Sequence, residues 1–340
     1  MIKKYSLKFS ILIPTYNGSK VISDTLKSIL SQSFDNFEII ITDDISKDDT
    51  EFIIKSIKDK RIKFYKNEKN LGYPGNLESA RKKARGDIIY LMGQDDILAK
   101  DALLNTYNAF KISENIGAVT RPYFWFNKDI KIPVRAKERI SSKEDTIVSI
   151  NSDFWKIKRV FESLDQLSGL AYRKKYMDIS FHPDIFPCHI YPFASIFKKH
   201  PIVFLKDYNI AVRIESSQTI HVSSIYKKSP IEDWKKMIEF IFSEKKFLKL
   251  RKRLIKDFIA RNYVGLLQIR NYGKYSWFLR EVKYLIKYRW QNLFSISFWF
   301  FTLGCAILPK RFLIFLINFY KKKINSKILN NKNIQFRWKK

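Results

Sequence analysis

The sequence predicts an α/β fold, with a mostly parallel sheet covered by helices on both faces, followed by a basic helical region. Two patterns in the first 120 residues indicate the sheet: short apolar runs alternate with amphipathic segments, and those runs are nearly continuous in Ile, Leu and Phe. Continuous apolar strands are typical of parallel sheets buried on both faces. The basic region is indicated by charge, because Lys and Arg concentrate in the last third of the chain.

The predicted elements alternate in order up to residue 120. Strands are expected at residues 9–13, 37–41, 61–65, 88–92 and 117–120. Helices are expected over residues 21–30, from residue 48, over 74–84 and over 101–110. In a sheet built this way, ligands bind beyond the carboxyl ends of the strands.

Polar residues gather at three of these strand ends. The loop "PTYNG" follows the first strand, "TDDIS" follows the second and "GQDD" follows the fourth. A turn or a helix cap would explain any one cluster. Three clusters at the same edge of a parallel sheet favour one binding cleft.

Adjacent carboxylates next to buried strands need a positive partner. Asp95 and Asp96 are hard oxygen ligands that suit Mg²⁺ or Mn²⁺, with phosphate oxygens completing the shell. Asp43 and Asp44 suit N–H or ribose hydroxyl donors. There is no GxGxxG and no GxxxxGK[ST], so neither a dinucleotide fold nor a P-loop is indicated.

The first loop adds groups that suit a nucleobase. Thr15, Tyr16 and Asn17 offer a hydroxyl, a ring for stacking and a side-chain amide. Together with the carboxylates they predict a site for a nucleoside diphosphate and a divalent metal.

The net charge of +31 is unevenly distributed. Residues 1–110 hold 18 Lys and Arg against 15 Asp and Glu, whereas residues 229–340 hold 26 against 6. A basic, aromatic-rich segment favours nucleic acid or an anionic lipid surface as partner. The two cysteines, Cys188 and Cys305, allow no disulfide framework, which fits a reducing cytoplasm, and we expect the N-terminus to be uncleaved.

Three stretches in order, "FSILIPTYNGSKVISDTLKSILSQSFDNFEIIITDDISKDDT", "NEKNLGYPGN" and "ARGDIIYLMGQDD", resemble the N-terminal half of family-2 glycosyltransferases with the GT-A fold, a Rossmann-like sheet. The resemblance covers about residues 8–110. It implies that Pro14 to Asn17 and Asp44 flank the nucleobase, that Asp95 lies near the ribose and that Asp96 binds the metal. The family's Asp-x-Asp motif reads Gln-Asp-Asp here, so its first acid is absent.

The resemblance also implies an inverting displacement, which needs a base near the acceptor hydroxyl. Family members usually place an acidic pair about 20 residues after a Gly-rich segment, which residues 167–177 resemble. No Glu-Asp pair follows here. His189 falls near the expected position, and Asp184 is the nearest acid upstream. His189 could equally be a packed, hydrogen-bonded side chain, and Asp184 a turn residue.

We expect two domains: a GT-A domain over residues 1–228, with a nucleotide-sugar half (1–120) and an acceptor half (121–228), and a basic helical region over 229–340. Ser229 to Glu232 form a capping box with proline at the first helical position. Residues 292–309 carry no charge but have basic residues on both sides. A membrane span, a packed helical subdomain and an interfacial hairpin broken at Pro309 are all possible, and the flanking charges favour the hairpin.

The expected function is that of an inverting, metal-dependent glycosyltransferase in cell-surface polysaccharide biosynthesis, peripheral or monotopic at the cytoplasmic face of the inner (plasma) membrane. The expected donor is a UDP- or dTDP-linked sugar, and the acceptor a glycan or a polyprenyl-diphosphate-linked glycan. The alternatives are a nucleotidyltransferase, or a nucleic-acid- or membrane-binding protein with an inactive GT-A-like domain. No helix-turn-helix, zinc finger or RNP-like motif supports nucleic acid as partner.

Overall fold

The structure is a computed structural model that describes residues 5–184, 187–214, 223–320, 334 and 336–338. The chain forms two compact units, one of Met1–Ser216 with Leu329–Lys340 and one of Ser217–Ile328. The first unit is therefore interrupted by the second along the sequence. The predicted boundary after residue 228 lies inside the second unit of this division.

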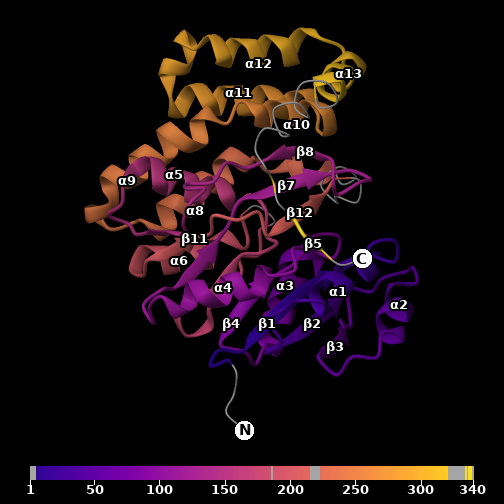
Figure 1. The fold of residues 1–340 in the computed structure, drawn as a ribbon. Coiled ribbons are helices and arrows are strands. Elements are labelled where there is room, and N and C mark those ends of the chain that lie inside the picture. The colour runs from indigo at the N-terminus through magenta and orange to yellow at the C-terminus, as the bar shows by residue number, and fades with distance from the viewer. Residues whose placement is uncertain (1–4, 185–186, 215–222, 321–333, 335, 339–340) are drawn as a thin grey trace. The chain divides into compact units, whose positions relative to one another are not determined.

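The first unit is the α/β part (Figure 1). Its strands are β1 (Phe9–Thr15), β2 (Phe37–Asp43), β3 (Ile62–Lys66), β4 (Ile88–Leu91), β5 (Ile97–Leu98), β6 (Ala118–Thr120), β7 (Tyr123–Phe126), β8 (Pro133–Ala136), β9 (Thr146–Val148), β10 (Ala171–Arg173), β11 (Ile202–Phe204) and β12 (Ile210–Arg213). Its helices are α1 (Ile22–Leu30), α2 (Thr50–Ser56), α3 (Gly72–Lys83), α4 (Ala102–Lys111), α5 (Phe154–Ser163) and α6 (Ile190–Lys199).

The main sheet has eight strands in the order β3-β2-β1-β4-β10-β6-β11-β9. β1 pairs in parallel with β2 and with β4, so the strand order reverses there, and ligands of such sheets bind at the carboxyl edge of this point. β10 runs antiparallel between β4 and β6, and β9 closes the far edge antiparallel to β11. A second sheet has the order β5-β12-β7-β8. The predicted mostly parallel α/β fold is confirmed, with these antiparallel additions.

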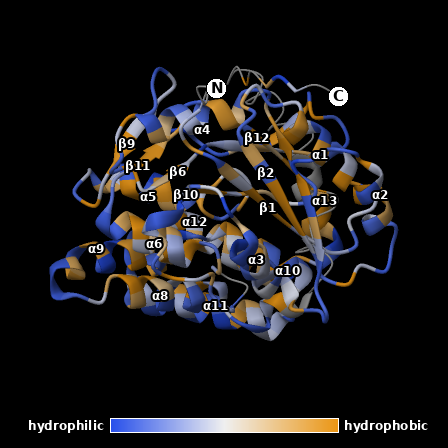
Figure 2. Ribbon diagram, turned by 90° about the horizontal axis from the view of Figure 1, so that it is seen from below, coloured by the Kyte–Doolittle hydropathy of each residue, from blue (hydrophilic) through white to orange (hydrophobic). Residues whose placement is uncertain are grey.

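The core forms because the central strands are apolar on both faces. Every residue of β2 and β4 is buried, and β1 is buried except for Pro14. Figure 2 shows β1 and β2 largely in the hydrophobic colour. At the amino edge, Glu38 accepts hydrogen bonds from Ser10 Oγ (2.7 Å), Lys63 Nζ (2.6 Å) and the Arg85 N–H (2.7 Å). Although burial acts to raise the pKa of Glu38, these partners lower it to about 2. The Glu38 carboxylate thus links strands β1, β2 and β3 at the amino edge of the sheet.

The second unit is helical: α8 (Pro230–Ile241), α9 (Leu248–Arg253), α10 (Val264–Tyr272), α11 (Tyr275–Tyr288), the 3₁₀ turn η6 (Trp290–Phe294), α12 (Ile296–Ile307) and α13 (Lys310–Tyr320). Ser229 caps α8 by accepting from the Glu232 N–H at 3.1 Å, and its hydroxyl donates to the buried Glu281 at 2.8 Å. The Glu232 side chain does not complete the predicted capping box, since its Oε1 has no hydrogen-bond partner.

The apolar stretch near the end of the second unit is broken between α12 and α13, at Leu308 and Pro309. Among the residues that the structure describes, no helix is both long and apolar enough to cross a membrane.

Candidate functional site

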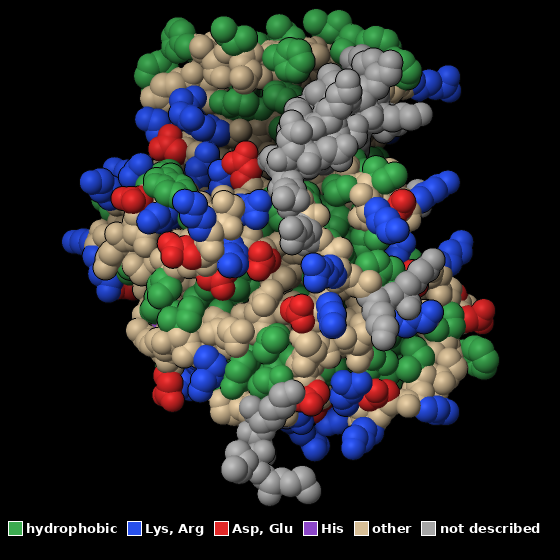
Figure 3. Space-filling model, in the orientation of Figure 1, with side chains coloured by type: hydrophobic (Ala, Val, Ile, Leu, Met, Phe, Trp, Pro, Cys, Tyr) green, Lys and Arg blue, Asp and Glu red, His purple; other side chains and the backbone are tan. Residues whose placement is uncertain are grey.

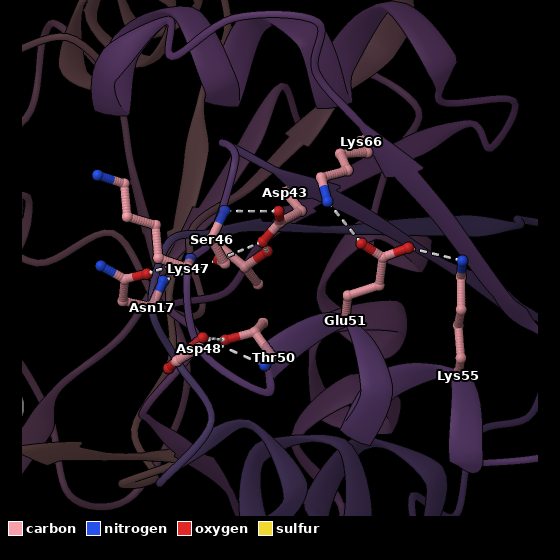
Figure 4. A network of polar contacts seen from close by, with 10 residues as sticks. Asn17, Asp43, Ser46, Lys47, Asp48, Thr50, Glu51, Lys55 and Lys66 are labelled. Carbon is pink, nitrogen blue, oxygen red and sulfur yellow. Dashed lines mark hydrogen bonds and ion pairs between the residues drawn. The ribbon is translucent and has the colours of Figure 1, made fainter.

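The loops after β1 and β2 are joined by the side chain and backbone of Asn17. Its N–H donates to Ser46 Oγ (2.9 Å), and its Oδ1 accepts from the Lys47 N–H (2.8 Å) (Figure 4). Asn17 has a φ of 49°, a left-handed conformation that asparagine tolerates better than most residues. The predicted site residue Asn17 therefore holds two strand ends together.

Asp43 is fully buried, and donors of the protein surround its carboxylate. It accepts hydrogen bonds from the Ser46 N–H (2.9 Å), the Ser46 hydroxyl and the Thr15 hydroxyl (3.3 Å). Figure 4 shows this carboxylate directed at the loop that follows β2. Its negative charge is therefore met by loop donors. Asp43 shapes the loop, and its predicted contact with a nucleotide stays a prediction.

Asp44 lies at the same strand end but faces another segment. Its Oδ1 accepts from Asn67 Nδ2 (2.9 Å) and from the Leu71 N–H (2.8 Å), while its own N–H donates to the Thr15 carbonyl (2.9 Å). Asn70 Nδ2 also donates to the Asp44 carbonyl at 3.1 Å. The asparagine-rich loop between β3 and α3 thus belongs to the site; its stretch "NEKNLGYPGN" contributed to the family resemblance, but none of its residues was predicted as a site residue. Its signal was "NEKN" at the end of the third predicted strand.

Gln94 joins the loop after β4 to the loop after β1. Its Oε1 accepts from the Tyr16 N–H (2.9 Å), and its Nε2 donates to the Tyr16 carbonyl (3.1 Å). An amide can make both bonds, whereas a carboxylate can only accept. This explains a glutamine in place of an acid. The Tyr16 ring remains 36% exposed at the loop surface, where a planar base could stack on it.

Asp95 and Asp96 have different surroundings. Asp96 is 2% exposed, and its carboxylate accepts from the Arg213 N–H (3.1 Å) and from the Ser168 hydroxyl. Burial, followed by the neighbouring charge of Asp95, raises the pKa of Asp96 well above its usual range, although Ser168, the Arg213 N–H and Arg121 act to lower it. Asp95 is only partly buried. Water and ligands therefore reach Asp95 more easily than Asp96.

A glycine precedes Gln94 because there is no room for a side chain beside the acidic pair. A Cβ on Gly93 would lie 3.0 Å from an Asp96 oxygen, 3.1 Å from an Asp95 oxygen and 3.2 Å from Ser168 Oγ. These contacts are closer than most side chains tolerate. The pair and Ser168 therefore share one small polar space.

The acidic pair fits a divalent cation bound mainly by a ligand's own oxygens. The carboxylates are hard oxygen donors, and a cation bound beside them would offset the burial and the repulsion that disfavour ionised Asp96. In the described part of the chain, no group of three or more His, Cys, Asp or Glu side chains could hold an ion. Mg²⁺ and Mn²⁺ commonly use one or two carboxylates and take the remaining ligands from phosphates.

Arg121 organises the loop that carries Ser168. This guanidinium is fully buried and donates to the carbonyls of Ser163 (3.0 Å), Gln166 (2.8 Å) and Ser168. Ser168 in turn donates its hydroxyl to Asp96 and accepts from the Gly93 N–H at 2.8 Å. Arg121 and Ser168 thus position the acidic pair, and the sequence analysis missed both. A buried arginine cannot be told from a surface one by local pattern.

His189 lies at the start of α6, and both of its ring nitrogens are hydrogen-bonded to protein. Nε2 is 2.8 Å from the Leu164 carbonyl, which can only accept, so Nε2 carries the proton. Nδ1 then accepts from the Tyr73 hydroxyl at 3.3 Å. Burial lowers the pKa of His189 to about 4, so the ring is neutral near pH 7. The packed arrangement is observed, and a role as base stays a prediction.

The other predicted catalytic residue, Asp184, lies in the loop between β10 and α6. Its N–H donates to His182 Nδ1 at 3.1 Å, and its carboxylate is 3.8 Å from the same nitrogen. This is the turn-like arrangement that was the alternative interpretation, and the catalytic assignment of Asp184 stays a prediction.

A carboxylate that the sequence analysis did not consider lies in the loop organised by Arg121. The side chain of Asp165 is 46% exposed, accepts from the Tyr123 hydroxyl and pairs with Lys137 Nζ at 2.8 Å. It is three residues from Ser168, which contacts Asp96. Asp165 is therefore an accessible carboxylate in the same loop as a residue of the acidic site.

The structure thus brings together the three strand-end clusters that the sequence placed at one edge. Tyr16 and Gln94 join the first and fourth strands, Asn17 joins the first loop to the second, and Asp44 joins the second strand to the segment before α3. These loops leave the carboxyl ends of β1, β2 and β4, where parallel sheets bind ligands.

Comparisons with known proteins agree with this arrangement. Residues 10–168 match the family model described as glycosyl transferase family 2. The chain is 39% identical over 88 residues to UDP-Glc:alpha-D-GlcNAc-diphosphoundecaprenol beta-1,3-glucosyltransferase WfgD of Escherichia coli, a match covering 26% of this chain and 35% of that protein. An uncharacterized glycosyltransferase of Haemophilus influenzae is 29% identical over 181 residues, 52% of this chain and 70% of that one. The matches to WfgD and to two other curated relatives extend over 88 to 101 residues. They cover 35% or less of the length of each of those proteins.

Solved structures resemble the chain over nearly its whole length. Staphylococcus aureus TarS 1-349 in complex with UDP-GlcNAc aligns with a TM-score of 0.66 and 17% identity, covering 97% of each chain. Mannosyltransferase PcManGT from Pyrobaculum calidifontis, in complex with GDP-Man and Mn²⁺, aligns with a TM-score of 0.54 and 15% identity, covering 94% of this chain and 89% of that one. At these identities the likeness establishes the fold, and it confirms the predicted GT-A-like architecture.

Proposed function

We propose that this chain, whose residues 10–168 match the model of glycosyl transferase family 2, transfers a sugar from a nucleoside diphosphate sugar to a glycan acceptor. One observation carries the proposal: hydrogen bonds join the loops after β1, β2 and β4 into one continuous edge. That edge presents an exposed aromatic ring, a carboxylate fixed by an asparagine-rich loop and an acidic pair. These are the groups that a nucleobase, a ribose and a metal-bound diphosphate require.

Each group has a distinct role in this proposal. The Tyr16 ring stacks on the base, and Asp44 accepts from a base N–H or a ribose hydroxyl. Asp95 ligates the cation, because it is the more accessible acid of its pair, while Asp96 holds Ser168 and Arg213 in place. A bound Mg²⁺ or Mn²⁺ would neutralise charge on the leaving diphosphate.

The transfer itself forms a bond between an acceptor oxygen and the anomeric carbon, and breaks the bond from that carbon to the diphosphate. Direct displacement inverts the anomeric centre, and a base takes the proton of the acceptor hydroxyl. Two candidates lie near the acidic site: His189, where the family resemblance places the base, and Asp165, which is more exposed. The low pKa of His189 makes it a weak proton acceptor near pH 7.

We infer a uridine nucleotide as donor, since TarS is solved with UDP-GlcNAc and WfgD is named for UDP-Glc. We infer a lipid-linked glycan as acceptor, since WfgD is named for a diphosphoundecaprenol substrate. Such an acceptor would lie in the membrane plane, and we propose that the enzyme works at the cytoplasmic face of the inner membrane.

The first test is calorimetry of the whole chain with UDP, dTDP, CDP and GDP, with and without Mn²⁺. We expect cation-dependent binding of UDP that Asp44→Asn weakens at least tenfold, with Asp184→Asn as the matched control that leaves it unchanged. Binding of none of the four nucleotides would contradict the proposal. With a UDP-sugar and an acceptor, release of pyrophosphate instead of UDP would indicate a nucleotidyltransferase.

The base is tested by comparing the turnover of Asp165→Asn and His189→Gln. The variant that removes the base should lower turnover by about 10²–10⁴-fold with little change in UDP affinity. Equal, small losses in both would mean that neither side chain is the base.

A further inference from the structure

The second unit exposes a band of large apolar side chains, which we call the outer apolar face: Trp290, Phe294, Ile296, Phe300, Leu303 and Ile307. Ile296 is 89% exposed, Phe294 78% and Phe300 74%. Residues 296, 300, 303 and 307 recur at helical spacing, so they share one side of α12. Figure 3 shows hydrophobic side chains along the edge of the second unit where Figure 1 labels α12.

The opposite side of α12 already packs on the unit. Phe298, Thr302 and Cys305 are buried, and Arg270 Nε donates to the Cys305 carbonyl at 2.9 Å. The outer face is therefore not needed for folding of the helix, yet it is just as apolar. A helix that is apolar all round is normally covered on every side. Contiguous exposed apolar area of this kind marks an interaction surface.

The charges around the face indicate what covers it. Residues 290–309 carry no charge at all, and residues 282–320 include no Asp or Glu. Arg289 precedes the uncharged stretch, and the exposed Lys310 and Arg311 follow it directly. The exposed Lys283 and Lys287 of α11 add two further cations. An apolar face bordered by cations alone is complementary to an anionic lipid surface, where aromatic side chains reside at headgroup level.

We propose that the outer apolar face binds the surface of an anionic bilayer, with α12 lying in the interface and the flanking cations contacting lipid headgroups. This membrane contact rests on the proposed function, because a lipid-linked acceptor would diffuse in the plane of the bilayer that the outer apolar face binds. In this proposal the contact is interfacial, because the cations lie on both sides of the uncharged stretch. Helices of this type insert their apolar side about 5–10 Å.

Binding of the full chain to vesicles tests the apolar part of the surface. With vesicles of phosphatidylcholine containing 30 mol % phosphatidylglycerol (about one anionic lipid in three, chosen to give a negative surface potential), we expect at least tenfold stronger partitioning than with phosphatidylcholine alone. The triple variant Ile296→Ser/Phe300→Ser/Ile307→Ser should lose at least about a hundredfold, since burying each large apolar side chain shifts an equilibrium about tenfold. Phe52→Ser, which removes a 75% exposed ring from α2, is the matched control and should change nothing.

The charged border is tested separately. Lys310→Gln/Arg311→Gln should weaken partitioning by about 30-fold, because each cation near an anionic leaflet contributes about a factor of five. Lys128→Gln/Lys131→Gln, two exposed lysines of the first unit, should change it by less than about threefold. Equal losses in both pairs would mean nonspecific attraction and would overturn the assigned surface.

A fluorescent label measures how deeply α12 inserts into the bilayer. Cys188 and Cys305 are buried, so Leu303→Cys can be labelled selectively with an environment-sensitive dye, with Phe52→Cys as control. We expect a blue shift on anionic vesicles for the Leu303→Cys label alone. No shift would overturn the proposal. So would a concentration-dependent dimer, measured without lipid, that the triple serine variant abolishes, because the face would then join two copies of the chain.

UDP calorimetry on the same variants separates this proposal from the proposed function. If the chain does not bind vesicles but still binds UDP, only the proposal of a membrane-binding surface is wrong. If the wild-type chain binds vesicles but no nucleotide, the proposed function fails and the surface stands.

Discussion

Two pairs of adjacent aspartates lie at the carboxyl edge of the sheet, and their charges are met in different ways. Asp43 and Asp44, after β2, accept hydrogen bonds from the serine, threonine, asparagine and backbone donors of neighbouring loops. Asp96, after β4, accepts from the Ser168 hydroxyl and the Arg213 N–H, but burial and then the neighbouring charge of Asp95 raise its pKa. The donors around Asp43 fix the loop after β2, whereas burial and repulsion disfavour the charged form of Asp96, which a bound cation would stabilise.

Among variants of the two pairs, Asp95→Asn should have the largest effect on turnover. It removes the accessible charge of the second pair, so turnover with a UDP-sugar should fall by about 10²–10³-fold and lose its response to Mn²⁺. Initial rates across Mn²⁺ concentrations measure both effects. Asp43→Asn should lower turnover per folded molecule by less than tenfold. Equal losses in the two variants would mean that the pairs do not differ in function.

Asp43→Asn should instead lower stability. Its carboxylate accepts three hydrogen bonds in a buried place, and an amide has only one acceptor atom, so the free energy of unfolding should fall by about 2–3 kcal/mol. Asp96→Asn should change it by less than about 1 kcal/mol or raise it, because burial disfavours the charge that is removed. Urea denaturation of the two variants measures the difference. A larger loss for Asp96→Asn would reverse the comparison.

His189 extends the comparison to a group that burial keeps neutral, although its hydrogen bond to the Leu164 carbonyl acts to raise its pKa. Its pKa is lowered from the ordinary 6.5 to about 4, so its contribution to stability is complete above pH 6.5 and is lost as pH falls to 4. That loss corresponds to about 3 kcal/mol. The unfolding free energy of His189→Gln should therefore fall less than that of the wild type over this range. Parallel pH profiles for the two proteins would show that His189 is not held neutral.

Gln94→Glu gives the smallest expected effect. The carboxylate can still accept from the Tyr16 N–H but repels the Tyr16 carbonyl, so the unfolding free energy should drop by about 1–2 kcal/mol. Gln94→Met, which keeps the size but forms neither bond, is the matched comparison for the urea midpoint. If Gln94→Glu is as stable as the wild type, the amide pairing with Tyr16 does not explain the missing acid.

Much of the fold could be predicted from the sequence, because the central strands are buried on both faces and are therefore nearly continuous apolar runs. The strands at residues 9–13, 37–41, 61–65, 88–92 and 117–120 were all predicted, and each matches an observed strand within a few residues. The second sheet and β10 were not predicted. Their strands are two to four residues long, too short to show a period, and their pairing depends on contacts distant in sequence.

The residues of the site could be predicted to a lesser extent. The sequence placed Tyr16, Asp44 and Asp95 at one edge, because strand ends of a parallel sheet converge there. The sequence does not reveal that Asp43 and Asp44 are both buried, whereas in the second pair only Asp96 is, because burial depends on loops that pack against the strand ends. Arg121 and Ser168 act through carbonyl and hydroxyl contacts formed only after residues far apart in sequence meet.

Residues 336–338 complete the first unit. Phe336 packs edge-on against Phe124, with ring centroids 5.1 Å apart, and the Lys100 N–H donates to the Arg337 carbonyl at 2.7 Å. The second unit, residues 217–328, separates the two sides of this contact in the sequence. The first unit therefore cannot form its contact with Phe336 until the second unit has been synthesised, about 6–20 s later at 5–20 residues per second.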